Sequence, residues 1–133
     1  MSRALYLGVD GGGTTTRAVV VDAAGSECGR GAAGGSNRAA VGAAAAADNV
    51  REATTRAVSA AGGVASDVRA AWIGLAGVGR PVDHDVMNPL LASLAATVHL
   101  TSDAALGLTA LPGALGVTLI AGTGTVAYGE RGR

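Results

Sequence analysis

The residues best suited to chemistry form a short polar segment between two apolar runs. The segment reads Asp10-Gly11-Gly12-Gly13-Thr14-Thr15-Thr16. Consecutive glycines can adopt positive φ at little steric cost and turn several N–H groups toward one point, which makes an anion-binding nest. The hydroxyls of Thr14 and Thr15 add neutral donors. Because Asp10 would repel a bound polyphosphate unless a divalent cation lay between them, the segment predicts a site for phosphate and Mg²⁺. A glycine-rich hairpin without a ligand is the alternative.

Two later segments extend this pattern. Asp103 stands between a predicted strand and a helical stretch, and Gly122-Thr123-Gly124-Thr125 forms a predicted turn between strands. Open α/β sheets bind ligands at the carboxyl ends of their strands, where the two glycine–threonine turns could enclose a polyphosphate. A carboxylate there could accept a proton from an attacking hydroxyl, so the pattern indicates phosphoryl transfer or ATP hydrolysis.

Each of these later residues also has a structural alternative. Asp103 is well placed to be the N-cap of the helix that follows it. The Gly122–Thr125 segment could be an ordinary hairpin turn. Asn37, which follows Gly-Gly-Ser, could be a loop residue that hydrogen-bonds its own backbone.

Composition excludes several kinds of site. The 133 residues include no lysine, so all ten basic residues are arginine. A Walker-type phosphate loop and a protein-kinase site both need a lysine on the phosphates, and neither is possible here. Cys28 is the only cysteine, which excludes an intramolecular disulfide and a cysteine-held cluster within one chain.

Charge and hydropathy suggest a cytoplasmic protein. The net charge is zero, which argues against broad binding to nucleic acid or to an anionic membrane surface. No signal peptide precedes the first apolar run. No segment has the roughly 18 consecutive apolar residues of a membrane-spanning helix.

The predicted elements form one α/β layer structure followed by a separate hairpin. Residues 1–113 are expected to form a mixed sheet with flanking helices, and residues 114–133 to begin a truncated second lobe. We therefore expect the chain to be the N-terminal part of a longer protein. The predicted strands are 4–9, 17–22, 27–33, 68–75, 97–101, 117–121 and 126–128, and the predicted helices are 39–61, 82–95 (interrupted by Pro89) and 104–111.

Five segments, taken in order, resemble a known family. They are DGGGTTTRAVVVDAAG, GGSN, WIGLAG, LTSDAALG and LIAGTGTVAYG. Together they resemble the BadF/BadG/BcrA/BcrD group of the actin–hexokinase–Hsp70 ATPase superfamily. Within that group the sequence is most similar to N-acetylglucosamine and glucosamine kinases.

The resemblance implies a fold, a reaction and a set of roles. It implies a ribonuclease-H-like domain that uses ATP and Mg²⁺ to phosphorylate an amino sugar, at the 6-hydroxyl, in a full-length protein that is a homodimer. Asp103 would be the general base on the sugar hydroxyl, Asn37 would bind sugar hydroxyls with Ser36 beside it, and Asp10 would hold Mg²⁺, usually through water. The phosphate-binding residues would be Gly11, Gly12, Gly13, Thr14 and Thr15 in the first loop and Gly122, Thr123, Gly124 and Thr125 in the second.

Two other functions stay open. The same group contains ATPase activators of 2-hydroxyacyl-CoA dehydratases and aromatic-CoA reductases, which use a cysteine-bound cluster between subunits, whereas this chain has Cys28 alone. The chain could also be a non-catalytic fragment. We expect the 133 residues by themselves to have negligible kinase activity, because half of the nucleotide cleft would be missing.

Overall fold

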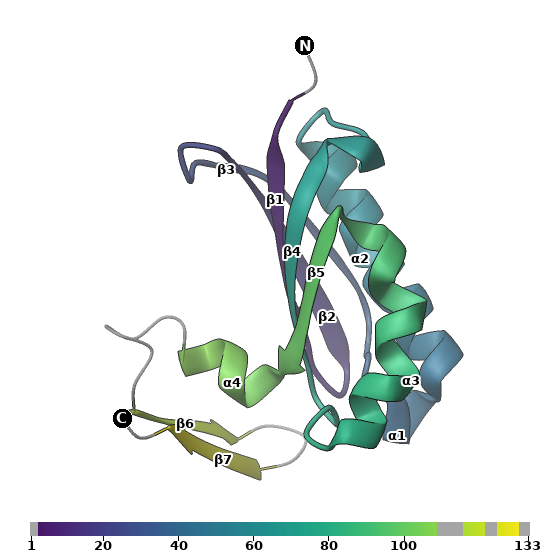
Figure 1. Cartoon of the computed structure of the whole chain (residues 1–133), viewed down its shortest axis with the longest axis vertical. Helices are drawn as coiled ribbons and strands as arrows, with labels where there is room; N and C mark the ends of the chain where they lie inside the picture. Colours follow the sequence, from purple (N-terminus) through teal and green to yellow (C-terminus); the bar gives the residue numbers. More distant parts are fainter. Residues whose placement is uncertain (1–2, 109–115, 122–124, 131–133) are drawn as a thin grey trace.

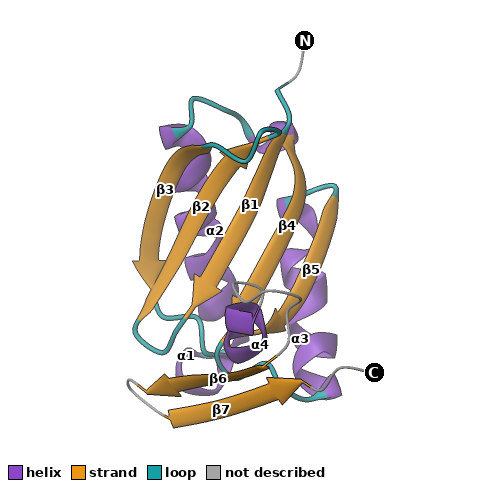
Figure 2. Cartoon of the chain, turned by 90° about the vertical axis from the view of Figure 1, so that its left-hand side faces the viewer, coloured by secondary structure: helices purple, strands orange, loops and turns teal. Residues whose placement is uncertain are grey.

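The structure is a computed structural model that describes residues 3–108, 116–121 and 125–130. Its main body is a five-stranded mixed sheet in the order β3-β2-β1-β4-β5 (Figures 1 and 2). The first three strands form the antiparallel meander that the sequence predicts, and β1, β4 and β5 run parallel. The carboxyl ends of these parallel strands therefore meet at one edge. The strands are β1 (Leu5–Gly11), β2 (Thr15–Asp22), β3 (Glu27–Gly34), β4 (Val68–Leu75) and β5 (Thr97–Ser102).

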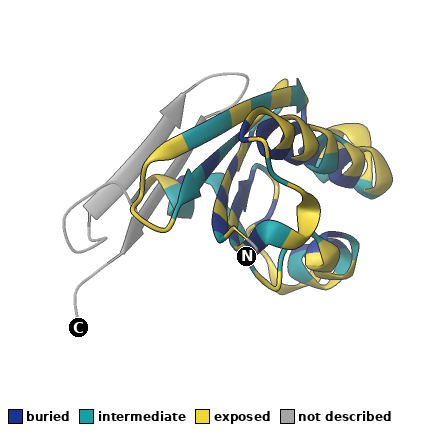
Figure 3. Ribbon diagram, turned by 90° about the horizontal axis from the view of Figure 1, so that it is seen from above, coloured by how far each residue is buried: buried dark blue, intermediate teal, exposed yellow. Residues whose placement is uncertain are grey.

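Helices cover the two faces of the sheet unequally. Two long helices, α2 and α3, lie on one face, and the short α4 lies on the other at the carboxyl end of β5 (Figures 1 and 2). The residues that face α2 and α3 are buried, as the view from above shows (Figure 3). The helices are α1 (Arg38–Val41), α2 (Ala43–Ala60), α3 (Pro81–Leu91) and α4 (Asp103–Leu108), with single 3₁₀ turns η1 (Ala65–Asp67) and η2 (Ala92–Leu94).

The alternation of β1 decides which of its residues can reach a ligand. Leu5, Leu7 and Val9 are buried beneath the helices, because successive side chains of a strand point to opposite faces. Asp10 therefore points to the face that carries α4, and it is exposed. The apolar residues thus anchor β1 in the core, and its polar last residues lie at the carboxyl ends of the parallel strands.

The prediction of one helix over 39–61 is wrong at its start. The chain breaks into α1 and α2 at Gly42, whose φ of 87° lies in the left-handed region. The predicted apolar face is confirmed, because Val50, Ala53 and Ala57 are all fully buried. The helix approaches β3 so closely that a Cβ on Gly31 would lie 2.2 Å from the carbonyl oxygen of Ala53. Small residues on both elements permit this contact.

The second predicted helix, 82–95, is also divided. It begins one residue earlier, at Pro81, where proline is favourable because the first helical N–H has no partner in the helix. Pro89 lies inside α3, and the helix ends at Leu91, two residues later. The 3₁₀ turn η2 then leads into β5. The predicted interruption is confirmed, although the break comes after the proline.

The last two strands form a sheet of their own. β6 (Gly116–Ala121) pairs antiparallel with β7 (Thr125–Glu130), and neither joins the main sheet. Both strands contact α4, so the hairpin lies at the carboxyl edge of the main sheet (Figures 1 and 2). That this hairpin begins a second lobe, after a first lobe of residues 1–113, stays a prediction.

Candidate functional site

The predicted phosphate loop is a tight hairpin between β1 and β2. The Gly12 N–H donates to the Thr15 carbonyl at 2.9 Å. The expectation that these glycines adopt positive φ is wrong, since the four positive-φ glycines in the described residues all lie elsewhere. Glycine is required for space instead: a Cβ on Gly11 would lie 2.1 Å from Ser36 Oγ and 2.4 Å from Leu75 Cδ2.

The threonines of this loop divide into two kinds. Thr14 and Thr15 are exposed at the tip, where their hydroxyls can reach a ligand. Thr16 is fully buried. Its Oγ1 is hydrogen-bonded to the Gly34 carbonyl at 2.7 Å and to Ser36 Oγ at 2.8 Å. Thr16 therefore connects the loop to the end of β3 and faces no ligand.

The Gly35–Asn37 segment is clamped to the phosphate loop. The Ser36 N–H donates to the Gly12 carbonyl at 3.0 Å, and a Cβ on Gly35 would lie 2.2 Å from the Gly13 carbonyl oxygen. From the other side, Asn49 Nδ2 donates to the Gly35 carbonyl at 2.7 Å. Ser36 is 1% exposed, so its side chain packs inside the protein and supports the segment.

Asn37 begins α1 and caps it. Its Oδ1 accepts a hydrogen bond from the Ala39 N–H at 3.0 Å, which is the backbone role that the sequence left open. Gly77, with φ of 80°, approaches this side chain so closely that a Cβ there would lie 2.3 Å from Asn37 Oδ1. The carboxamide nitrogen remains as the donor of Asn37 for a ligand hydroxyl.

Asp103 is not the N-cap of α4. Ser102 takes that role, because its Oγ accepts a hydrogen bond from the Ala105 N–H at 3.1 Å. Asp103 is instead the first helical residue, and its Oδ1 accepts from the Ala104 N–H at 2.9 Å. The helix rests on Gly74 of β4, where a Cβ would lie 2.6 Å from Leu106 Cβ.

The charge of Asp103 acts on the carboxyl group of Asp10. Although the Asp10 residue is exposed, partial desolvation of its carboxyl group raises its pKa above the usual value; the charge of Asp103 raises it further, and Arg17 opposes both. The strand register agrees, since Asp10 pairs with Gly74, which pairs with Thr101, two residues before Asp103. A bound cation would relieve the repulsion that disfavours the charged form of Asp10.

The structure describes only part of the second predicted phosphate loop. Gly122, Thr123 and Gly124 lie outside the described residues, and Thr125 is the first residue of β7. The strands on either side lie beside α4, which carries Asp103. The roles of this second loop stay predictions.

The sequence did not indicate one feature beside the site, a buried carboxylate between two arginines. Asp83 of α3 is 2% exposed and forms ion pairs with Arg38 and Arg80. Its position three residues after Arg80 and two after Pro81 is typical of an acidic residue in the first turn of a helix. That signal could have located Asp83, but not its partner Arg38, which is 45 residues away.

The sequence matches the BadF/BadG/BcrA/BcrD ATPase family over residues 7–133. The chain belongs to this family. Its fold is the actin-like ATPase fold, as the sequence predicted. A comparison with functionally curated proteins returned no significant match.

Two solved structures are similar to this family member. One is a provisionally assigned N-acetylglucosamine kinase from Chromobacterium violaceum, with 25% identity, a TM-score of 0.76, and coverage of 96% of this chain and 45% of that one. The other has the same provisional assignment and comes from Porphyromonas gingivalis, with 25% identity, a TM-score of 0.73, and coverage of 92% and 43%. The chain therefore spans less than half the length of these structures.

None of the described helices of this chain is long and apolar enough to cross a membrane.

Proposed function

We propose that the full-length protein transfers phosphate from ATP to an amino sugar, N-acetylglucosamine or glucosamine, at its 6-hydroxyl. One observation carries the proposal: the Gly11–Thr15 loop, the Gly35–Asn37 segment and Asp103 all lie at the carboxyl edge of one sheet. Direct hydrogen bonds join the first two, and charge couples the third to Asp10. The family and the two similar structures support an ATP-dependent kinase or ATPase.

The residues divide the work by their chemistry. The hydroxyls of Thr14 and Thr15 and the amides of the loop would bind phosphate oxygens without a lysine. Asn37 would donate its carboxamide N–H to a sugar hydroxyl. Asp103 would accept the proton of the attacking hydroxyl as a general base.

Asp10 and Asp103 also fit a role beside Mg²⁺. No group of three or more histidine, cysteine or acidic side chains in the described residues could hold a metal ion alone. Mg²⁺ commonly takes one or two carboxylates and completes its shell with water and phosphate oxygens, which matches this donor set. When bound, the ion would neutralise phosphate charge, and Asp10 would orient it.

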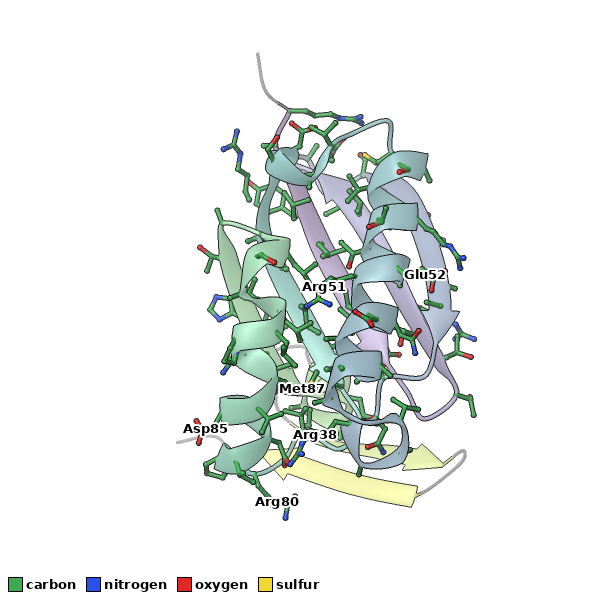
Figure 4. All side chains as sticks on the ribbon, turned by 90° about the vertical axis from the view of Figure 1, so that its right-hand side faces the viewer. Arg38, Arg51, Glu52, Arg80, Asp85 and Met87 are labelled. Atoms are coloured by element: carbon green, nitrogen blue, oxygen red, sulfur yellow. The ribbon has the colours of Figure 1, made fainter. Side chains whose placement is uncertain are left out.

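The test is phosphate transfer by the full-length protein to glucosamine, N-acetylglucosamine and glucose, measured with γ-labelled ATP. Asp103→Asn should lower kcat by at least about 100-fold, the usual contribution of a general base, and leave ATP affinity within a factor of two. Asp85→Asn is the matched control, because Asp85 is exposed on α3 and points away from the body (Figure 4). Absence of any sugar phosphate from the wild-type protein would reject the proposal.

No described contact favours the alternative, an ATPase activator that holds an iron–sulfur cluster. Cys28 Sγ lies 3.5 Å from Arg3 Nη2, and Arg3 precedes the amino end of β1. Asp10 lies seven residues further along, roughly 20 Å away at the rise of a strand. The lone thiol is therefore at the opposite end of the sheet from the proposed nucleotide site.

A further inference from the structure

The described carboxylate with the most hydrogen bonds lies outside the residues assigned so far. Asp83 Oδ1 accepts from Arg38 Nε at 3.0 Å, from Arg38 Nη2, and from Arg80 Nη2 at 3.2 Å. Its Oδ2 accepts from the N–H groups of Gly79 at 3.2 Å and Arg80 at 2.9 Å, and from Arg80 Nε at 3.3 Å. These donors hold the pKa of Asp83 well below its usual range, with the Arg80 side chain as the largest cause.

Its two sets of partners belong to two segments that both adjoin Asn37. Arg38 follows Asn37 directly, and the loop 77–80 contacts the Asn37 side chain at Gly77. One carboxylate thus fastens both the segment that contains Asn37 and the loop that Asn37 touches. Arg38 and Arg80 converge at the start of α3, next to α1 (Figure 4).

On the carboxyl side of Asn37 the chain has few anchors. The helix α1 is four residues long and contains no buried residue, so burial of its own apolar side chains contributes little to its position. On its amino side the anchors are Ser36 and Gly35, and after Val41 the chain turns at Gly42. The Arg38–Asp83 ion pair joins α1 to α3.

We propose that Asp83 is a positioning residue that holds Asn37 against loop 77–80 through Arg38, and so sets the geometry of the sugar site. This rests on the proposed function, in which Asn37 donates to a sugar hydroxyl. The partners of Asp83 are two arginines and two backbone N–H groups. Losing it frees the Asn37 segment and leaves two guanidinium groups without their acceptor, while the Gly11–Thr15 loop keeps its own hydrogen bonds.

Steady-state kinetics of the full-length protein separate these effects. Asp83→Asn should raise the KM for the sugar about 10- to 100-fold, the scale expected from a displacement near 1 Å, and change the KM for ATP less than 2-fold. Asp83→Glu should recover part of the loss. Asp85→Asn, on the same helix and exposed, should match the wild type in both constants. Equal KM increases for ATP and sugar, or none, would overturn the proposal.

Two arginine variants serve if Asp83→Asn fails to fold. The Arg38 side chain is 23% exposed and the Arg80 side chain is 73% exposed. A substitution at position 80 removes the guanidinium group but leaves the backbone N–H that donates to Asp83. Arg38→Gln should therefore raise the KM for the sugar more than Arg80→Gln does. An equal or reversed order would contradict the route through Arg38.

Hydrogen exchange provides a readout that needs no sugar kinase activity. In Asp83→Asn, peptides covering residues 36–42 and 77–80 should exchange faster, while peptides from β1 and the centre of α2 stay as in the wild type. Unchanged exchange at 36–42 would refute the positioning role. If the wild-type protein phosphorylates no sugar but the exchange result holds, the proposed function fails and the structural role of Asp83 stands.

Discussion

The contact between Gly74 and α4 allows a quantitative test of how Asp103 is positioned. A Cβ at position 74 would lie 2.6 Å from Leu106 Cβ and 2.7 Å from Leu106 Cδ2. Carbon atoms pack at about 3.5–4.0 Å, so Gly74→Ala needs a separation of about 1 Å. A change of rotamer cannot provide it, because the nearer atom, Leu106 Cβ, is fixed to the helix backbone.

The displacement must reach Asp103. Asp103 and Leu106 are three residues apart in a helix of six, and residues at i and i+3 lie on the same face. Moving Leu106 from β4 therefore moves Asp103 from the sheet edge. We expect overpacking to cost about 1–3 kcal/mol of folding free energy and the displacement to lower kcat/KM for the sugar about 100-fold.

The assay combines denaturant unfolding and sugar phosphorylation of the full-length protein. Gly8→Ala is the matched control, because Gly8 lies in the neighbouring strand and a Cβ there meets nothing within 4 Å. It should keep its activity and unfold within about 1 kcal/mol of the wild type. If Gly74→Ala is as active as Gly8→Ala, α4 does not set the position of Asp103, and the reasoning fails.

Three further predictions concern stability. Gly31→Ala should destabilise the chain by about 1–3 kcal/mol or more, because the new Cβ would lie 2.2 Å from a backbone oxygen of α2; urea unfolding that matches Gly8→Ala would contradict this. Asp10→Asn should raise the thermal midpoint of the ligand-free protein at pH 7, because partial desolvation and the charge of Asp103 disfavour ionised Asp10, and the gain should shrink as pH falls through the raised pKa of Asp10; a lower midpoint at pH 7 would count against it. Asp83→Asn should destabilise at pH 7, because the native pKa of Asp83 is lowered, and its deficit should narrow below about pH 4, where the unfolded carboxyl protonates; a deficit independent of pH would exclude the ion pairs as its cause.

The sequence predicts those parts of the fold whose signals lie in a few neighbouring residues. The meander of β1 to β3 follows from apolar alternation and from the turn at Gly25, whose φ is 82°. The break at Gly42 was missed because alanines follow it, and their high helix propensity hides one glycine. The ion pair of Arg38 with Asp83 was missed because two local patterns 45 residues apart do not show that they meet.

The glycines of the predicted phosphate loop serve a structural purpose other than the one the sequence suggested. The sequence favoured positive φ there, because that is the use of glycine that one residue's own backbone can explain. The fold instead brings Ser36 and Leu75 onto Gly11, and Gly35 onto the Gly13 carbonyl. Close approach between distant segments is a tertiary property, so the tripeptide could predict a site but not how it is built.

The same contacts explain how a chain rich in small residues holds a site in place. The phosphate loop, the Asn37 segment and α4 each meet a glycine of another element, at Gly35, Gly77 and Gly74 respectively. The contacts at Gly35 and Gly74 join backbone to backbone or to the first side-chain atom, so they transmit displacement with little freedom for a rotamer change. A methyl group added at Gly74 should therefore harm activity more than stability, whereas at Gly31, beneath α2 and away from the ligand edge, it should harm stability more than activity. Measuring both quantities for both variants distinguishes glycines that position the site from glycines that only close the core.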